Sequence, residues 1–188
     1  MCENVYMTTK DAVNVVLGII GDNGMSGVEV LAHSKSAAID RICPADFSAE
    51  MRSRVAAEIN RQDLVETTQS HNKFRLQLSV KGIHRLQRAE IERVKIQRPD
   101  EWDGLWRMVT YDVPRAQNAQ RRLFTRQLER LGFAMIRESV WFHPYPCFAQ
   151  IETIMTYCGL QRYVTLAEIT RIDNVSLAKL KRAYPNLT

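Results

Sequence analysis

The sequence predicts an α+β protein of two domains, an N-terminal winged helix-turn-helix over residues 1–97 followed by a ferredoxin-like βαββαβ domain over residues 102–188. Two observations on periodicity predict this fold class. Before residue 97, apolar residues at helical spacing are followed by a two-stranded hairpin pattern, and after residue 104 strand and helix patterns alternate. Between them, residues 97–104 contain a proline and three acidic residues, which is typical of a linker.

In the first domain, helical spacing predicts three helices before the hairpin. The third begins at Ser48, a suitable N-cap, and places Met51, Val55 and Ile59 on one face. Three helices followed by a hairpin is the order of a winged helix-turn-helix. The expected helices are Lys10–Ile20, Val28 to about Cys43, the helix from Ser48, and Gly82 to about Val94; the expected strands are Leu64–Gln69 and Phe74–Val80.

The distribution of charge points to a polyanionic partner for this domain. Residues 1–47 hold three Lys or Arg against six Asp or Glu, whereas residues 48–98 hold eleven against six, a net charge of +5. The helix before the hairpin would lie in the major groove of double-stranded DNA, with the hairpin on flanking phosphates. The candidate DNA contacts are Arg52, Arg54 and Arg61 on the helix, and Lys73 and Arg75 on the hairpin. The alternative is a solvated arginine face without a ligand.

The second half of the chain predicts strands and helices in the order β-α-β-β-α-β, that of a ferredoxin-like sandwich. The expected strands are Trp106–Val113, Phe133–Ile136, Ser139–His143 and Tyr163–Ile169, and the expected helices are Ala116–Leu131 and Phe148–Tyr157. An open antiparallel sheet has two edges, and a partner subunit commonly covers one of them. We therefore expect this domain to form a homodimer.

Composition indicates the class of protein and its cellular compartment. Hydrophobic residues at 45% and charged residues at 25% are ordinary for a globular chain. The apolar run Val15–Ile20 is too short to cross a bilayer, and no basic segment precedes it, so we expect a cytoplasmic protein without a membrane partner. The cysteines have no CxxC spacing, which favours reduced thiols over zinc or disulfide sites. They are Cys2, Cys43, Cys147 and Cys158.

Several separated motifs resemble known families. They are Trp102-Asp103-Gly104-x-Trp106-Arg107, Tyr111-Asp112-Val113-Pro114, Leu131-Gly132-Phe133, and Ser139-Val140-Trp141-x-His143-Pro144 with Cys147. Together they resemble the central domain of PaaX-type repressors and are similar to the small ferredoxin-fold endonuclease of CRISPR adaptation. The upstream Leu78-Ser79-Val80-Lys81-Gly82-x-x-Arg85-Leu86 resembles the end of the wing in PaaX-type proteins.

The PaaX resemblance implies a sequence-specific, homodimeric transcriptional regulator that needs no cofactor. The endonuclease resemblance implies the alternative, a metal-dependent nuclease with an added winged helix, in which Asp112 of each subunit would bind catalytic Mg²⁺. From the residues alone, one carboxylate per chain provides few ligands for a metal ion, which favours a structural role in which Asp112 caps the turn into the next helix. A non-catalytic scaffold, using the winged helix for protein contacts, is a third possibility.

Overall fold

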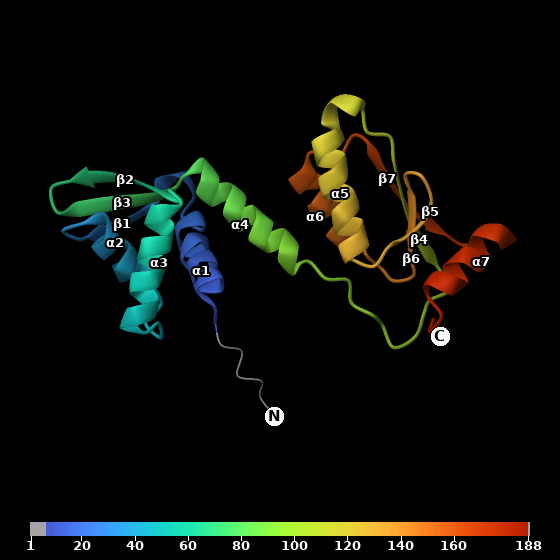
Figure 1. Ribbon diagram of the computed structural model, residues 1–188, viewed down its shortest axis with the longest axis horizontal. Helices are drawn as coiled ribbons and strands as arrows, with labels where there is room; N and C mark the ends of the chain where they lie inside the picture. The colour runs from blue at the N-terminus through green and yellow to red at the C-terminus, as the bar shows by residue number, and fades with distance from the viewer. Residues whose placement is uncertain (1–6, 188) are drawn as a thin grey trace. The chain divides into compact units, whose positions relative to one another are not determined.

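The chain folds as a mixed α/β protein with two antiparallel sheets, as the computed structural model in Figure 1 shows. The structure describes residues 7–187, the side chain of Met25 excepted. The chain divides into a first unit that ends at Glu92 and a second that begins at Arg93. Within residues 7–187, no helix is long and apolar enough to cross a membrane.

The first unit combines a three-stranded sheet with helices that share one core. Its elements are α1 (Thr9–Gly21), the 3-10 helix η1 (Gly24–Ser26), β1 (Val28–Leu31), α2 (Lys35–Ile42), α3 (Ala49–Arg61), β2 (Val65–Ser70), β3 (Lys73–Leu78) and α4, which begins at Val80 and ends at Arg93. Leu17 of α1, Ile39 of α2 and Ile59 of α3 are fully buried in this core. The apolar stripe of each helix thus supplies the core.

The strand β1 corrects the prediction of one helix from Val28 to about Cys43. Val28–Leu31 pairs antiparallel with β3, so that the sheet order is β1-β3-β2, and the helix begins only at Lys35. Gly27, with a φ of 65°, lets the chain approach β3, because a Cβ there would lie 2.5 Å from the carbonyl oxygen of Leu76. A four-residue strand carries too little periodicity to be recognised without its pairing partner.

The second unit contains the predicted order of strands and helices, and one helix that was not predicted. Its elements are β4 (Trp106–Tyr111), the 3-10 helix η2 (Arg115–Gln117), α5 (Asn118–Arg130), β5 (Ala134–Arg137), β6 (Val140–His143), α6 (Phe148–Cys158), β7 (Val164–Ile169) and α7 (Asn174–Ala183). All strand pairs are antiparallel, and the sheet order is β5-β6-β4-β7. β5 and β7 are therefore the edges of this sheet.

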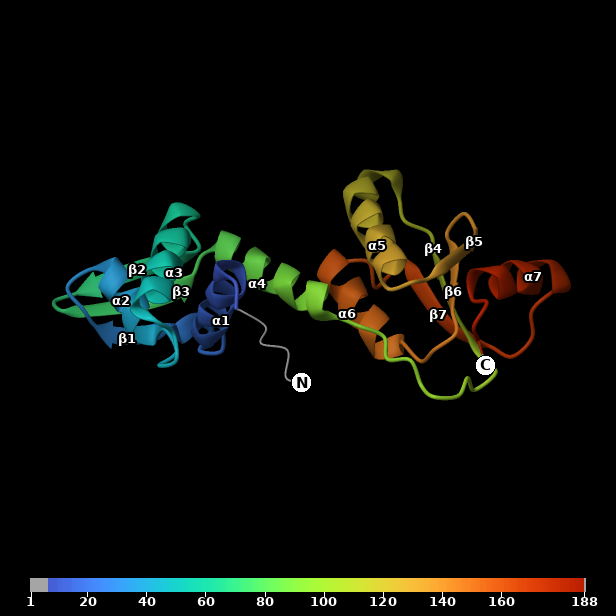
Figure 2. The ribbon, with the colours of Figure 1, turned by 60° about the horizontal axis from the view of Figure 1, so that its bottom comes forward.

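Helices cover both faces of the four-stranded sheet. Figures 1 and 2 show α5 and α6 on one side and α7 on the other. On the first side, Tyr111 of β4 meets Phe124 of α5 edge to face at 5.8 Å between ring centroids. On the second, Leu180 of α7 is fully buried in a cluster with Trp106 and Phe142. The helix α7 was missed because its apolar residues are recognisable as a core face only once the sheet is in place.

Of the glycines, Gly82 leaves the least room for a Cβ, which predicts a large effect of one added methyl group. A Cβ at this buried position would lie 2.1 Å from the carbonyl oxygen of Leu64. We expect Gly82→Ala to lower the free energy of unfolding by about 1–3 kcal/mol through forced displacement of α4. Gly18, on α1, has nothing within 4 Å of its Cβ position.

The matched control is therefore Gly18→Ala, which we expect to raise the free energy of unfolding by about 0.5–1 kcal/mol because alanine has the higher helix propensity. Urea unfolding followed by circular dichroism measures both variants. Equal stabilities of the two would contradict the close contact at Gly82.

Candidate nucleic-acid interface

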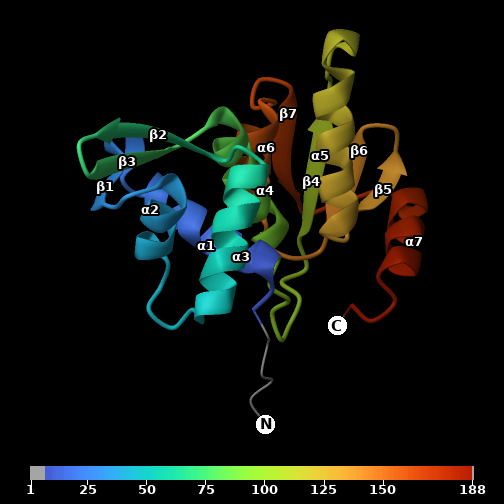
Figure 3. The same cartoon turned by 60° about the vertical axis from the view of Figure 1, so that its left-hand side comes forward.

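The helix α3 is fixed by a cap and by its buried face. The Ser48 hydroxyl accepts a hydrogen bond from the backbone N–H of Met51 at 3.2 Å, and Glu50 lies in the first turn, where the helix dipole favours an acid. Val55 and Ile59 are fully buried. The opposite face of α3, which carries Arg54 and Arg61, is consequently turned towards solvent, whereas Arg52 is partly buried. Figure 3 shows α3 with the β2–β3 hairpin that follows it.

Arg52 is held by the loop before α3. Its Nε donates to the carbonyl oxygen of Phe47 at 2.9 Å, and its Nη2 donates to that of Ala45 at 3.2 Å. Both acceptors lie within seven residues upstream of Arg52, so this side chain fastens the loop between α2 and α3. Arg52 therefore has a structural role in stabilising this loop, which its spacing in the sequence did not indicate.

Arg54 and Arg61 are exposed, and each forms an ion pair along the helix. Arg54 pairs with Glu50, and Arg61 pairs with Glu58 through bonds of 2.7 and 2.9 Å. The hydrogen bond from Arg61 holds the pKa of Glu58 below its ordinary value. Because exposed ion pairs are weak, either arginine can exchange its carboxylate for another anion at small cost.

The β2–β3 hairpin carries the other two predicted contacts. Its turn contains His71 with a φ of 53°, and Lys73 at the start of β3 is exposed without an ion pair in the described part of the chain. Arg75 lies opposite Glu29 of β1 in register, donates to it from Nε at 3.0 Å, and lowers its pKa. Since β1 was not predicted, this cross-strand partner could not be foreseen. Lys73 is the more available cation of the two.

The unit boundary also divides the basic stretch on which the prediction of DNA contacts rested. Arg93, Lys95 and Arg98 belong to the second unit. The remaining residues 48–92 hold eight Lys or Arg against six Asp or Glu, a net charge of +2. The predicted helix and hairpin therefore attract a polyanion less strongly than the net charge of residues 48–98 indicated.

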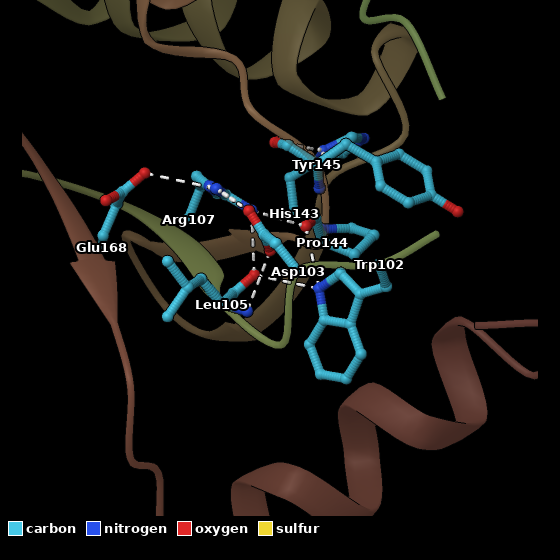
Figure 4. A network of polar contacts seen from close by, with 8 residues as sticks. All are labelled: Trp102, Asp103, Leu105, Arg107, His143, Pro144, Tyr145 and Glu168. Atoms are coloured by element: carbon cyan, nitrogen blue, oxygen red, sulfur yellow. Dashed lines mark hydrogen bonds and ion pairs between the residues drawn. The ribbon is translucent and has the colours of Figure 1, made fainter. Parts of the chain in front are cut away.

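A buried arginine, absent from the predicted sites, organises the second unit (Figure 4). The side chain of Arg107 on β4 is only 3% exposed. Its guanidinium pairs with Asp103 through both carboxylate oxygens and reaches Glu168 of β7 at 3.3 Å. It also donates to the carbonyl oxygens of Leu105 and Pro144 at 3.1 and 2.9 Å. A buried cation is tolerated because these oxygens replace water.

The segment expected as a linker supplies part of this network. Asp103 is the principal partner of Arg107, whose hydrogen bond keeps the pKa of Asp103 low. The Trp102 indole donates to the carbonyl oxygens of Leu105 and Pro144, each at 3.0 Å, and its ring packs 5.1 Å from that of Trp106. The motif Trp102-Asp103-Gly104-x-Trp106-Arg107 is therefore part of the second unit's core and its polar network.

The described cysteines, Cys43, Cys147 and Cys158, are buried free thiols. Burial raises the pKa of Cys147 to about 12 and those of Cys43 and Cys158 to about 11, so all three stay protonated at neutral pH. Cys2 lies outside the described residues. Within residues 7–187, no group of three or more His, Cys, Asp and Glu side chains could hold a metal ion.

Asp112 is exposed just beyond the end of β4. Its backbone N–H donates to the carbonyl oxygen of Tyr163 at 2.9 Å, while its carboxylate forms no hydrogen bond with any described residue. The residue capping η2 is Pro114, without a side-chain bond, so the expected capping role of Asp112 is not observed. This chain thus contributes a single solvated carboxylate here, and metal binding by Asp112 stays a prediction.

Comparison with known protein families identifies the second unit. Residues 99–180 match the PaaX protein central Cas2-like domain. Over these residues the second unit is similar to the central domain of PaaX-type proteins, and we call it the PaaX-type domain. The match begins just before Trp102, spans every strand of the four-stranded sheet and reaches into α7. It confirms the PaaX resemblance predicted from the motifs. No curated protein matches the chain.

Trp141 and His143 of the motif Ser139-Val140-Trp141-x-His143-Pro144 are packed inside the PaaX-type domain. Trp141 is buried and donates from its indole to the Tyr111 hydroxyl at 3.3 Å. His143 is buried beside Phe133, with 4.9 Å between ring centroids, and its Nδ1 accepts from the backbone N–H of Tyr145 at 3.1 Å. These side chains fix the sheet and the loop after β6.

The buried His143 predicts acid sensitivity of the PaaX-type domain. Burial lowers the pKa of His143 from 6.5 to about 4. The unfolded chain therefore takes up this proton first, so stability is complete above pH 6.5 and is lost as the pH falls towards 4. The loss reaches about 3 kcal/mol at pH 4. Tryptophan fluorescence during unfolding reports on this unit, because all three tryptophans belong to it.

His143→Asn is the informative variant, since its Oδ1 can accept the Tyr145 bond without titrating. We expect it to abolish this part of the pH dependence, whereas His84→Gln, at an exposed histidine, retains it. An identical pH profile for wild type and His143→Asn would contradict the role assigned to burial.

Proposed function

We propose that the protein is a PaaX-like transcriptional regulator that binds double-stranded DNA as a homodimer. The first unit would act as a winged helix-turn-helix, and the PaaX-type domain, as a ferredoxin-like fold, would join two subunits. One observation carries the proposal: helices and strands in the order α-β-α-α-β-β, followed by α4, precede a domain similar to the PaaX central domain in the same chain. In support, the β2–β3 hairpin follows the capped helix α3 directly in the chain, and β1 pairs with β3 to complete a three-stranded sheet.

In this proposal α3 is the recognition helix and the hairpin is the wing. Arg54 and Arg61 would exchange their carboxylate partners for DNA, and Lys73 would contact a phosphate at the wing. Arg52 would act indirectly, by fixing the loop that sets the start of α3. Arg75, paired with Glu29, would contribute after a similar exchange.

The direct test of the helix and the wing is a set of single variants, Arg54→Ala and Arg61→Ala on α3 and Lys73→Ala on the hairpin. We expect each substitution to weaken binding to a selected operator. The slope of log K against log salt concentration should fall by about 1 for each phosphate that the variant no longer neutralises. Fluorescence anisotropy across a salt series measures both quantities.

The control is Arg88→Ala on α4, which removes an exposed arginine with an i,i+4 acidic partner, Glu92, much like Arg54 with Glu50. We expect Arg88→Ala to bind like wild type. Equally weakened binding in Arg54→Ala, Arg61→Ala and Arg88→Ala would show that only total charge matters and would remove α3 from the interface.

The dimer makes a prediction of its own about the operator. Two subunits joined with two-fold symmetry present two recognition helices, so selection from random duplexes should enrich an inverted repeat. Sedimentation equilibrium should give twice the mass of one chain. A monomer that selects a single half-site would contradict this part of the proposal.

Asp112→Asn completes the test of function. We expect it to bind as wild type does, and DNA incubated with either protein and Mg²⁺ to stay intact on a sequencing gel. Metal-dependent cutting that the substitution abolishes would replace the regulator by the nuclease.

A further inference from the structure

The net positive charge of this protein lies on the second unit, whereas the proposed function assigns DNA binding to the first. The first unit holds eleven Lys or Arg against twelve Asp or Glu, a net charge of −1. The second holds fifteen against nine, a net charge of +6, which exceeds the +5 of the whole chain. Long-range attraction of a polyanion is therefore directed to the second unit.

Much of this charge lies on one helix. Arg122, Arg126 and Arg130, here called the α5 arginine stripe, are spaced four residues apart and exposed. The buried side of α5 is formed by Phe124 and Leu128, both fully buried, so the stripe lies on the opposite, solvent-facing side. Successive members of the stripe are about 6 Å apart along the helix axis.

The stripe differs from the exposed arginines of the first unit. On α3 and α4, Arg54, Arg61 and Arg88 each have a carboxylate partner on their own helix. Arg122 and Arg126 form no ion pair with any residue in the described part of the chain, although Glu129 lies one turn beyond Arg126. Their guanidinium groups are thus not engaged by an internal carboxylate.

This spacing works against the helix itself. Like charges four residues apart repel and destabilise an isolated helix, whereas an acid at one of these positions would stabilise it. The first turn of α5 contains no acid, and its N-terminus has no side-chain cap. A row of arginines under mutual repulsion is consistent with an external anionic ligand that relieves it.

We propose that the α5 arginine stripe binds the phosphate backbone of nucleic acid and gives the PaaX-type domain a sequence-independent contact of its own. This inference deepens the proposed function and rests on it for the identity of the polymer. Guanidinium groups bind phosphate through paired hydrogen bonds, and a regular row of them suits a linear array of phosphates. The stripe would increase the affinity for DNA of every sequence equally, while α3 would determine which sequence is preferred.

A nucleic-acid backbone fits this surface better than an acidic protein does. Protein interfaces are centred on buried apolar or aromatic anchors. None of the large hydrophobic residues that are exposed in the described part of the chain lies on α5. The face offers charge and hydrogen-bond donors without an apolar centre, which is typical of backbone contacts.

The test is Arg122→Gln/Arg126→Gln in the full chain, because glutamine keeps helix propensity while removing both charges. The matched control is Arg162→Gln/Arg171→Gln, which removes two exposed arginines from loops of the same unit. Anisotropy across a salt series is measured with the selected operator and with a scrambled duplex of equal length. Thermal melting checks the fold, and we expect the α5 variant to melt no lower than wild type.

We expect the α5 variant to lower the slope of log K against log salt concentration by about one to two, on both duplexes alike, since each phosphate contact contributes about 0.9. The ratio of the two affinities should stay unchanged, and the control should match wild type. A folded α5 variant with the wild-type slope overturns the inference and leaves the α3 proposal intact. Conversely, a wild type that binds both duplexes equally, with a slope that falls in the α5 variant, supports the stripe and contradicts sequence-specific regulation.

Discussion

The guanidinium of Arg107 lies inside the second unit, and a cation can stay there only if oxygen atoms replace its hydration shell. Those oxygens come from three separate parts of the chain: Asp103 and Leu105 before the sheet, Pro144 after β6, and Glu168 on β7. Satisfying one buried charge therefore determines the course of the segment entering the sheet and of the loop leaving it. Trp102, bonded to two of the same carbonyls, adds apolar burial to this arrangement.

The two units use arginine in different ways. In the first, arginines either fasten loops, as Arg52 does, or are paired on the surface, as Arg54 and Arg61 are. In the second, Arg107 is internal, and Arg122 and Arg126 on α5 face solvent without an ion pair to any described residue. This division suits the proposed regulator, in which the shape of the first unit would provide selectivity and the charge of the second would provide attraction.

The helix α7 gives the PaaX-type domain a second packed face. Its Leu180 covers Trp106 and Phe142, and the Tyr184 hydroxyl accepts from the N–H of Ala134 while lying 2.7 Å from the carbonyl oxygen of Gly132. With helices on both faces, the open parts of this sheet are the outer strands β5 and β7. Pairing between subunits through this domain would then use a strand edge, where unpaired backbone groups are available.

The sequence by itself determined the elements with strong periodicity or end signals: the capped α3 with Val55 and Ile59 inward, the β2–β3 hairpin, and the βαββαβ order with its PaaX resemblance. These follow from local spacing, which the chain carries without reference to distant residues. Only the tertiary structure decided β1, which is too short to be recognised without β3, and α7, whose apolar face needs the sheet. The tertiary structure also decided which charged side chains are buried, paired or exposed. Whether an arginine is buried like Arg107, paired like Arg75 with Glu29, or open to solvent like Arg122 depends on residues brought close in space, and spacing along the chain does not encode those neighbours.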